Sequence, residues 1–536
     1  MKEGHRFSEA TTATFVNRGL WAPEDDYLRR HRFSFPKRVA IIDGDQEINY
    51  LDYDRMVSNL AKGFITAGFK KGQVVSFQVP NVVEHFLLLQ GLRRAGLQFL
   101  ALDMTLRAAE LVACLSLAEA RALVSYHGFG NFDYLTMHRQ LVKAVPSLRN
   151  LVIAGNKVAL NTAEMEFAEL MALGSKSSIS ESEISKIWLA PSQVVGLKLT
   201  SGSASSPKIT KILGYVPVKR IEALIARFQL TPNDILLAMA PLTGGAGRVL
   251  AIWCAHPVGA SVVLMQRFSA EEALSLIEKH RVTIACGVPT QLIKMLQIKA
   301  SEKRQAGSLK AIFYTGAPLA SDAARELMDR FNCPVVGLYG SQDGGIYACS
   351  DVKDEPDVLA KTSGKLFPDI EARVVDDNGW EVPPGNEGEL LFRGAGVNMG
   401  GYLGDTDAMT STFDSSDWYH TGDLGYFDSQ ANLIVSGRKK EVINRGGWKI
   451  TPREIEDLLL MHPKITNAAV VRMPDPVLGE RACAYVSPVN DQTFTFEEMK
   501  EYLLAQGLAI FKLPERLEVI QDFPLVAGQK ISKRDL

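Results

Sequence analysis

Residues 74–103, VVSFQVPNVVEHFLLLQGLRRAGLQFLALD, carry the clearest signal of fold class in this chain. An apolar run of strand length (residues 74–80) is followed by a helix-like segment (84–96) and by a second apolar run (97–103). A strand, a helix and a strand in this order are typical of parallel structure, because parallel neighbours need a crossover connection. The same rhythm continues to Gly155 and predicts an α/β unit.

Later segments predict three further units. Apolar runs between residues 234 and 340 repeat the strand-and-helix rhythm and predict a second α/β subdomain. From about Asp369 the short strands with Gly and Pro turns indicate a small β-barrel-like subdomain. After Gly437 comes an α+β segment, in which Thr451 and Pro452 mark the start of an amphipathic helix. We therefore expect an N-terminal domain (1–436) and a small C-terminal domain (442–536), with the boundary between them at residues 437–441.

Composition narrows the function classes. The 536 residues are too many for one core, and the formal charge of −2 comes from interspersed acids and bases. This pattern favours a small-molecule substrate or a protein partner over nucleic acid or a membrane surface. No apolar run is long enough to span a bilayer and the start lacks the apolar core of a secretory signal, so we expect a cytoplasmic protein. The six cysteines form no CxxC or Cys/His cluster, which predicts ordinary buried thiols without zinc or disulfides.

A small-residue loop follows an apolar run at residues 199–209, LTSGSASSPKI. Such a loop can turn backbone N–H groups and hydroxyls toward phosphate oxygens, while Lys208 neutralises their charge. A Ser/Gly-rich surface loop without a ligand explains the same residues, and the GxxxxGK[ST] pattern is absent.

Four other segments carry candidate site residues. In GLYGSQDGG (337–345), Tyr339 could stack on a purine and Asp343 could hold magnesium. In WYHTGDLG (418–425), Asp423 lies in a glycine turn suited to ribose hydroxyls, and Arg438 could add a second contact. Lys530, in FPLVAGQKISK (523–533), is a point charge that could follow a phosphate or carboxylate oxygen. Each segment alone could be structural, whereas all of them together point to an ATP site.

The chain resembles the adenylate-forming enzymes, which include acyl-CoA synthetases and the adenylation enzymes of peptide synthesis. TSGSASSPK, YGSQD, YHTGD, GRKKE and the Lys530 segment stand in that family's order over nearly the whole chain. Within the family the chain is most similar to the stand-alone aryl-acid ligases of siderophore assembly, such as 2,3-dihydroxybenzoate–AMP ligases. FDYLTMHRQL (132–141), INRGGWKI (443–450), LGERACAYV (478–486) and residues 507–524 carry this narrower likeness.

The resemblance implies a two-step reaction. A carboxylate attacks the α-phosphate of Mg-ATP to give an acyl-adenylate and pyrophosphate, and a thiol then displaces AMP. The side chains mainly supply position and charge. The resemblance implies that pyrophosphate is bound by Thr200, Ser201, Gly202, Ser203 and Lys208, and that adenine is contacted by Tyr339 and Gly340. It also implies that Asp343 binds magnesium and that Asp423 and Arg438 bind the ribose. Lys530 would stabilise charge in the first step, and Lys440 would be the hinge (437–441) about which a mobile C-terminal domain turns.

The sequence departs from the family pattern at several positions. Ala204 and Ser205 replace the usual Thr and Gly of the phosphate loop, Asp343 replaces a glutamate, and Gln529 separates Gly528 from Lys530. In PLTGGAGRV (241–249), Thr243, Gly244 and Gly245 stand where the aryl-acid ligases have His-Asn and an aromatic residue. The resemblance implies an acid pocket at Thr243, Gly244, Gly245, Val249, Gly316 and Ile346. Without the asparagine we expect a wider, less polar floor that admits a bulkier or differently substituted acid, unless the glycines only shape a loop.

These observations predict an ATP-dependent ligase that transfers an aromatic acid to the phosphopantetheine thiol of a carrier protein. One alternative is an aryl-CoA ligase that uses free coenzyme A. A second alternative, motivated by the altered phosphate loop, is a degenerate, non-catalytic binding subunit. Retention of Asp423, Arg438 and Lys530 together counts against the second alternative.

Overall fold

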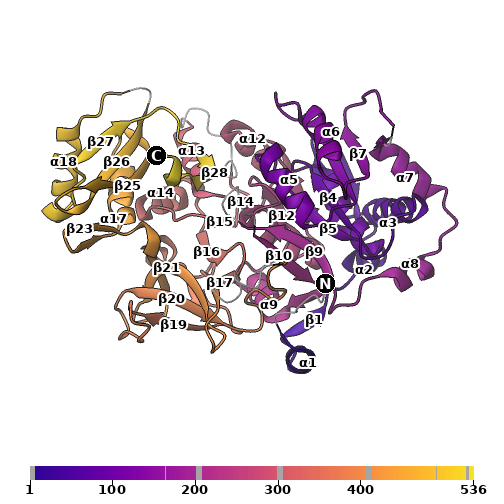
Figure 1. Ribbon diagram of the computed structural model, residues 1–536, viewed down its shortest axis with the longest axis horizontal. Coiled ribbons are helices and arrows are strands. Elements are labelled where there is room, and N and C mark those ends of the chain that lie inside the picture. Colours follow the sequence, from indigo (N-terminus) through magenta and orange to yellow (C-terminus); the bar gives the residue numbers. More distant parts are fainter. Residues whose placement is uncertain are drawn as a thin grey trace.

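The first sheet of the N-terminal part has seven strands. We describe a computed structural model that covers residues 7–162, 164–200, 208–298, 306–404, 412–489, 492–526 and 530–536 (Figure 1). All neighbouring strands of this sheet are parallel except β10 and β9. The strand order is β10 (Ile209–Leu213), β9 (Val194–Leu199), β5 (Gln98–Ala101), β4 (Val74–Gln78), β6 (Ala122–His127), β7 (Asn150–Gly155) and β8 (Glu164–Glu166).

The second sheet has nine strands and a parallel centre. Its two edges, from β16 to β18 and from β2 to β3, are antiparallel. The strand order is β18 (Lys365–Leu366), β17 (Gly345–Cys349), β16 (Val335–Ser341), β15 (Ala311–Tyr314), β14 (Ile284–Gly287), β12 (Ile235–Ala238), β13 (Ser261–Leu264), β2 (Val39–Asp43) and β3 (Gln46–Asn49). These two sheets confirm the predicted pair of α/β subdomains.

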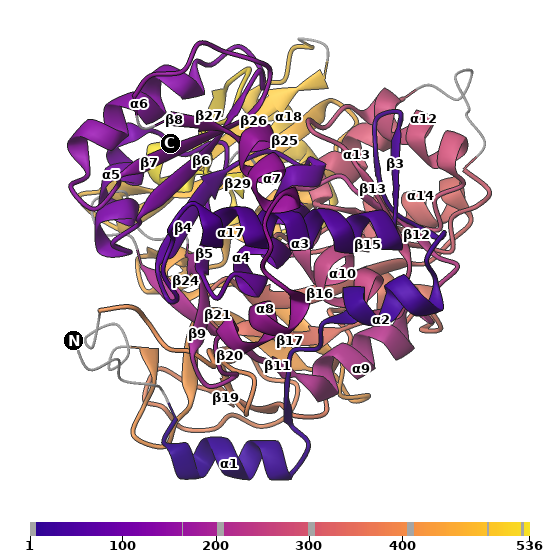
Figure 2. The same cartoon turned by 90° about the vertical axis from the view of Figure 1, so that its right-hand side faces the viewer.

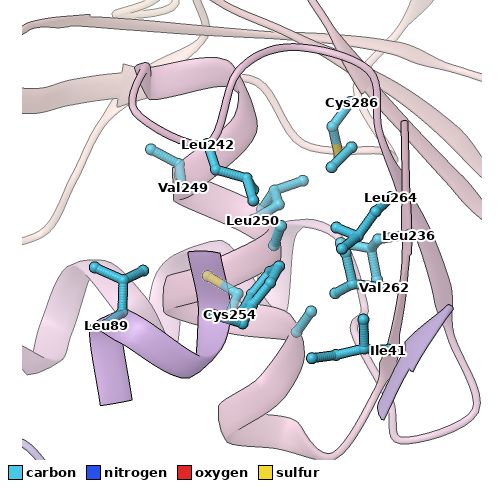
Figure 3. Close-up of a cluster of buried hydrophobic side chains, with 14 of the residues drawn as sticks. Ile41, Leu89, Leu236, Leu242, Val249, Leu250, Cys254, Val262, Leu264 and Cys286 are labelled. Atoms are coloured by element: carbon cyan, nitrogen blue, oxygen red, sulfur yellow. The ribbon is translucent and has the colours of Figure 1, made fainter. Parts of the chain in front are cut away.

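The largest core cluster joins both sheets through the helices α3 (Tyr50–Thr66), α4 (Val83–Arg94) and α10 (Gly245–Leu250). Figure 2 shows α3 and α4 near the middle of the molecule. In Figure 3, Leu89 of α4 and Val249 and Leu250 of α10 lie in the same cluster as four side chains of the second sheet, Ile41, Leu236, Val262 and Leu264. Because α4 and α10 are buried between the sheets, a polar side chain on either needs a local partner.

The other helices of the N-terminal part flank the two sheets. A short helix of π type, Ala251–Ala255, continues α10. The flanking helices are α1 (Glu9–Asn17), α2 (Tyr27–Ser34), α5 (Ala108–Leu117), α6 (Tyr134–Ala144), α7 (Phe167–Ser175), α8 (Glu181–Ile187), α9 (Val218–Arg227), α11 (His256–Val258), α12 (Ala270–His280), α13 (Pro289–Gln297), α14 (Ser321–Phe331) and α15 (Pro356–Lys361). A small two-stranded sheet pairs β1 (Trp21–Pro23) with β11 (Tyr215–Pro217).

The predicted barrel-like segment forms a four-stranded antiparallel sheet. Its strands are β19 (Glu371–Val375), β20 (Gly388–Arg393), β21 (Tyr419–Phe427) and β22 (Leu433–Arg438), in that order. A single 3₁₀ turn, Lys439–Glu441, then leads out of this sheet.

The C-terminal part has its own sheet and its own core. The sheet contains β24 (Trp448–Ile450), β23 (Ile443–Arg445), β26 (Gly479–Pro488), β25 (Ile465–Asp475) and β27 (Arg516–Val519). The helices α17 (Pro452–Leu460) and α18 (Phe496–Ala505) pack on it, and their core cluster contains only residues after Glu441. Thr451 and Pro452 begin α17 as expected, although the Thr451 side chain makes no capping hydrogen bond.

Two further expectations concern the chain as a whole. All six cysteines are free and buried, which confirms them as ordinary interior thiols. Within the described ranges, no helix combines the length and the apolar character needed to cross a membrane.

Candidate functional site

Asp423 and Arg438 face each other across the β21–β22 hairpin, where the strand register pairs them directly. Arg438 Nε lies 3.0 Å from Asp423 Oδ1, and the Tyr339 hydroxyl donates to Asp423 Oδ2 at 2.6 Å. Burial and the neighbouring Asp423 charge raise the pKa of Tyr339 well above its ordinary value, so its hydroxyl stays a donor. The structure thus brings together three residues that the sequence placed in different segments.

An opening of about 330 Å³ lies beside this trio. It is lined by Thr421, Gly422, Arg438, Lys439 and Lys440. Gly422 has a φ of +67°, a left-handed conformation that glycine adopts without strain. The volume is within the usual range for small-molecule sites, and the basic lining suits a phosphate-bearing ligand.

Asp343 is held by two tyrosines from another part of the chain. Its carboxylate accepts from Tyr402 Oη at 2.6 Å and from Tyr419 Oη at 2.8 Å. Burial acts to raise the pKa of Asp343, but its hydrogen bonds, with those from Tyr402 and Tyr419 the strongest, together outweigh burial and hold the pKa below its ordinary value. Asp343 is therefore a fixed, ionised carboxylate at neutral pH.

This arrangement fits a magnesium ion of the kind that travels with a nucleotide. Magnesium is commonly held by one or two carboxylates, while substrate phosphates supply other oxygens. Among the described residues, no group of three or more His, Cys, Asp or Glu could form a complete protein cage. Asp343 matches the single-carboxylate pattern.

Gly340, which the sequence placed beside the adenine, lies close to the neighbouring turn. A Cβ at this position would lie 2.5 Å from the Gly345 carbonyl oxygen.

The phosphate loop is described only at its two ends. Thr200 donates from its backbone N–H and its hydroxyl to the Lys208 carbonyl, at 2.9 and 3.1 Å. Lys208 Nζ lies 5.6 Å from the centre of the Tyr402 ring, so this lysine is close to a residue that holds Asp343. Ser201, Gly202, Ser203, Ala204 and Ser205 lie outside the described residues.

The residues of the proposed acid pocket are only partly brought together by the contacts of the described residues. A Cβ on Gly245 would meet only Thr315 Cγ2, at 3.8 Å, and Gly316 has a φ of +93° beside Val288. Gly244 is extended (φ −92°, ψ 169°), a conformation open to any residue. The Thr243 hydroxyl is already bonded to Asp103 at 2.8 Å. Val249 and Ile346 are members of the main hydrophobic core, which gives both a packing role.

Lys440 and Lys530 lie before and after the C-terminal sheet along the chain. Lys440 is exposed in the 3₁₀ turn between the four-stranded sheet and the C-terminal sheet. Lys449 Nζ, in the C-terminal part, lies 2.5 Å from Asp377 Oδ2, and Arg453 donates to the Val435 carbonyl. Lys530 begins β29 (Lys530–Ile531), which pairs with β28 (Leu525–Val526). The contacts of Lys449 and Arg453 join the C-terminal part to the segment that forms the four-stranded sheet.

We expect Tyr419→Phe to make activity fall off earlier as the pH is lowered. The Tyr419 hydrogen bond lowers the pKa of Asp343, whereas burial raises it. Without this hydrogen bond the pKa of Asp343 rises, so the ionised form is lost at a higher pH. A hydrogen bond to a charged group stabilises by about 1.5–3 kcal/mol, so activity near the acid limb should fall about tenfold or more. The measurement is the pH profile of kcat/KM. Tyr134→Phe, which loses a hydroxyl bonded to the Met104 carbonyl, is the control, and an unmoved acid limb in Tyr419→Phe would contradict this role.

Sequence reasoning missed four side chains near these segments. Tyr402 and Tyr419 hold Asp343, although both lie in segments that read as turns or strands. Lys198 of β9 and Arg248 of α10 line a second, small cavity between the sheets. A lysine inside the apolar run that precedes the phosphate loop was the available signal for Lys198.

Comparison with known proteins gives two family matches. Residues 28–403 match the model of the AMP-binding enzyme family, and residues 454–530 match that of the AMP-binding enzyme C-terminal domain. Together the matches include both α/β subdomains and the part that carries α17 and α18.

Individual relatives align with this chain over almost its full length. A 2,3-dihydroxybenzoate-AMP ligase of Bacillus subtilis is 30% identical over 98% of this chain and 95% of its own length. A medium-chain fatty-acid–CoA ligase of Escherichia coli is 28% identical over 99% of this chain and 93% of its own. A solved structure of the anthranilate CoA ligase AuaEII with anthranoyl-AMP has a TM-score of 0.83 at 21% identity, covering 96% of each chain. That structure shows a shared fold.

Proposed function

The chain belongs to the family of AMP-binding, adenylate-forming enzymes, and from this membership we propose that it activates an aromatic carboxylic acid and transfers it to a carrier-protein phosphopantetheine thiol. The observation that carries the proposal is the frame of Tyr339, Asp423 and Arg438 beside a basic opening, with the fixed carboxylate of Asp343 nearby. The likeness to a 2,3-dihydroxybenzoate-AMP ligase over 98% of the chain supports the aromatic substrate class.

In the proposed first step the residues orient ATP and the acid and stabilise charge. Asp423, held by Arg438 and Tyr339, is positioned to accept hydrogen bonds from ribose hydroxyls. Thr200 and Lys208, with Ser201, Gly202 and Ser203, would bind the departing pyrophosphate. Magnesium, when held by Asp343, supplies positive charge to the phosphate oxygens. Lys530 would stabilise the charge that develops between the carboxylate and the α-phosphate.

In the proposed second step the C-terminal domain, residues 442–536, turns about the hinge at 437–441. The single exposed turn around Lys440 and the separate C-terminal core support such a motion. Rotation would withdraw Lys530 and admit the thiol, which attacks the acyl carbon and releases AMP. The protein needs no covalent intermediate for either step.

The experiment that tests the proposal supplies enzyme, MgATP and a panel of aryl acids, and measures acid-dependent pyrophosphate release. The acceptor is then identified by adding either a holo carrier protein or free coenzyme A to the best acid. We expect thioester formation on the carrier protein. Preferential acylation of coenzyme A would instead favour the second candidate, an aryl-CoA ligase, which the full-length likeness to a fatty-acid–CoA ligase supports.

We also predict that Gly244→Asn changes substrate preference. Because Gly244 is extended and precedes the first turn of α10, asparagine fits the backbone and is a favourable capping residue. Its side chain should fill space used by the preferred acid and offer a hydrogen bond to a 2-hydroxyl worth about 0.5–1.5 kcal/mol, or up to about tenfold. The measurement is the ratio of kcat/KM for salicylate and for the preferred acid. Gly379→Asn, on an exposed turn, is the control, and an unchanged ratio would remove Gly244 from the acid pocket.

A further inference from the structure

Three basic side chains line a small cavity between the two α/β sheets. Lys198 comes from β9, Arg248 from α10 and His85 from α4, while apolar side chains, among them Leu89, Leu197 and Leu242, complete the wall. The cavity volume is about 10 Å³, which is room for one water molecule. Lys198 and Arg248 both keep some exposed surface.

No ion pair joins Lys198 or Arg248 to an acidic side chain in the described part of the chain, although the charge of Asp343 reaches Lys198. Arg248 Nη2 donates to the Thr243 carbonyl at 3.1 Å, and neither Arg248 nor Lys198 forms an ion pair there. Two carboxylates accept hydrogen bonds from neutral donors: Asp103 accepts from Thr105 and Thr243, and Asp343 accepts from Tyr402 and Tyr419. Two basic side chains that share a buried cavity without an ion-paired anion are costly to charge.

The electrostatic environment agrees with this geometry. Burial lowers the pKa of Lys198 well below its ordinary value, and the charge of Arg248 lowers it further. Burial lowers the pKa of Arg248 to about 10, so this guanidinium stays charged at neutral pH. His85 lines the same cavity, is 1% exposed and has a pKa lowered by burial to about 3, so it is neutral. A bound anion would pair with the Arg248 guanidinium and would favour the charged form of Lys198.

The cavity adjoins the proposed acid pocket. The Arg248 side chain turns back along α10 to the Thr243 carbonyl, at the start of the helix that carries Gly244 and Gly245. Lys198 lies two residues before Thr200, and the charge of Asp343 acts on it. An acid bound at Gly244 would therefore lie at the start of the helix that carries Arg248, and Lys198 lines the same cavity as Arg248.

We propose that the substrate acid carries a second acidic group, which binds between Lys198 and Arg248. This inference rests on the proposed function and deepens it by naming a substrate class: acids with two anionic groups, such as benzenedicarboxylates. The two long side chains have flexible stems, so they can move apart to admit a carboxylate into a cavity that holds only one water at rest. An acid with a neutral group at that place would leave the cations unpaired.

The test compares each diacid with its neutral counterpart of the same shape. The probes are the three benzenedicarboxylates and glutarate, each beside the compound in which one carboxylate is a carboxamide. We expect at least one diacid to exceed its amide in kcat/KM by about 10- to 100-fold, since charge-assisted hydrogen bonds are about twice as strong as neutral ones and two cations contribute. The preference should appear mainly in KM, because the second group takes no part in bond formation.

Lys198→Gln and Arg248→Gln should each reduce that preference at least several-fold while leaving the enzyme active on the amide. Lys176→Gln, at the exposed end of α7, is the control and should leave the ratio unchanged. Thermal unfolding checks that the variants are folded, and removal of an unpaired interior cation should not lower Tm. Calorimetric binding of the diacid without ATP gives a readout independent of turnover.

Two results would overturn the inference. One is a kcat/KM that is no higher for any diacid than for its amide, while monoacids are activated normally. The other is a diacid preference that survives both folded glutamine variants. Either result leaves acid activation intact, so the proposed function would stand; failure of that function would appear as no acid-dependent pyrophosphate release from any acid.

Discussion

Replacement of Lys530 by alanine is expected to abolish adenylate formation while largely sparing thioester formation from pre-made acyl-adenylate. Only the first step develops charge between the acid and the α-phosphate, and loss of one electrostatic contact aimed at such charge costs about 10²–10³ in rate. The measurement is a pair of half-reactions: acid-dependent pyrophosphate release, and thiol acylation from the synthetic adenylate.

Two variants separate charge from position in this experiment. Lys530→Arg keeps the charge but changes its shape, so it should recover part of the first half-reaction. Lys500→Ala removes an exposed lysine of α18 and should leave both half-reactions unchanged. If Lys530→Ala forms adenylate at the native rate, another group performs the role assigned to Lys530.

Replacement of Lys440 by proline is expected to separate the two half-reactions in a different way. Lys440 lies in a 3₁₀ turn, whose φ of about −50 to −70° suits proline, so proline should favour the domain orientation described here. A rotated backbone incompatible with proline would cost about 3 kcal/mol, or roughly 10² in the half-reaction that needs it. One half-reaction should therefore fall far more than the other.

Lys440→Ala is the matched control, because it removes the side chain but leaves the backbone free to rotate. It should retain both half-reactions within a few-fold, as expected for an exposed side chain. Equal, mild losses of both half-reactions in Lys440→Pro would place the hinge elsewhere in the chain.

The sequence was informative where a residue pattern is local. Strand-and-helix alternation predicted both α/β subdomains, and the change to short strands after Asp369 predicted the β subdomain that now appears as a four-stranded sheet. The capping residues predicted the start of α17 at Pro452. The motif residues Tyr339, Asp423 and Arg438 meet in one hydrogen-bonded frame, because the register of β21 and β22 brings two of them together and β16 supplies the third.

The parts that the sequence did not predict depend on contacts between distant segments. Tyr402 and Tyr419 hold Asp343 from positions 59 and 76 residues further along the chain, and no local pattern marks such a pairing. Likewise, Lys198 and Arg248 come from distant segments of the chain and line one cavity only in the folded protein. The expectation of a less polar acid pocket came from the glycines alone, without these two cations. Strand register and helix packing decide such groupings, and both follow from the whole fold.

Acid-dependent exchange of labelled pyrophosphate into ATP tests the central claim most directly, because it reports adenylate formation without requiring the second substrate. With a broad panel of aromatic acids and diacids, the account predicts exchange that needs magnesium, depends on the acid and falls about 10²–10³-fold in Lys530→Ala. Absence of acid-dependent exchange with every acid, in a folded protein that binds ATP, would contradict the account and favour a non-catalytic binding role.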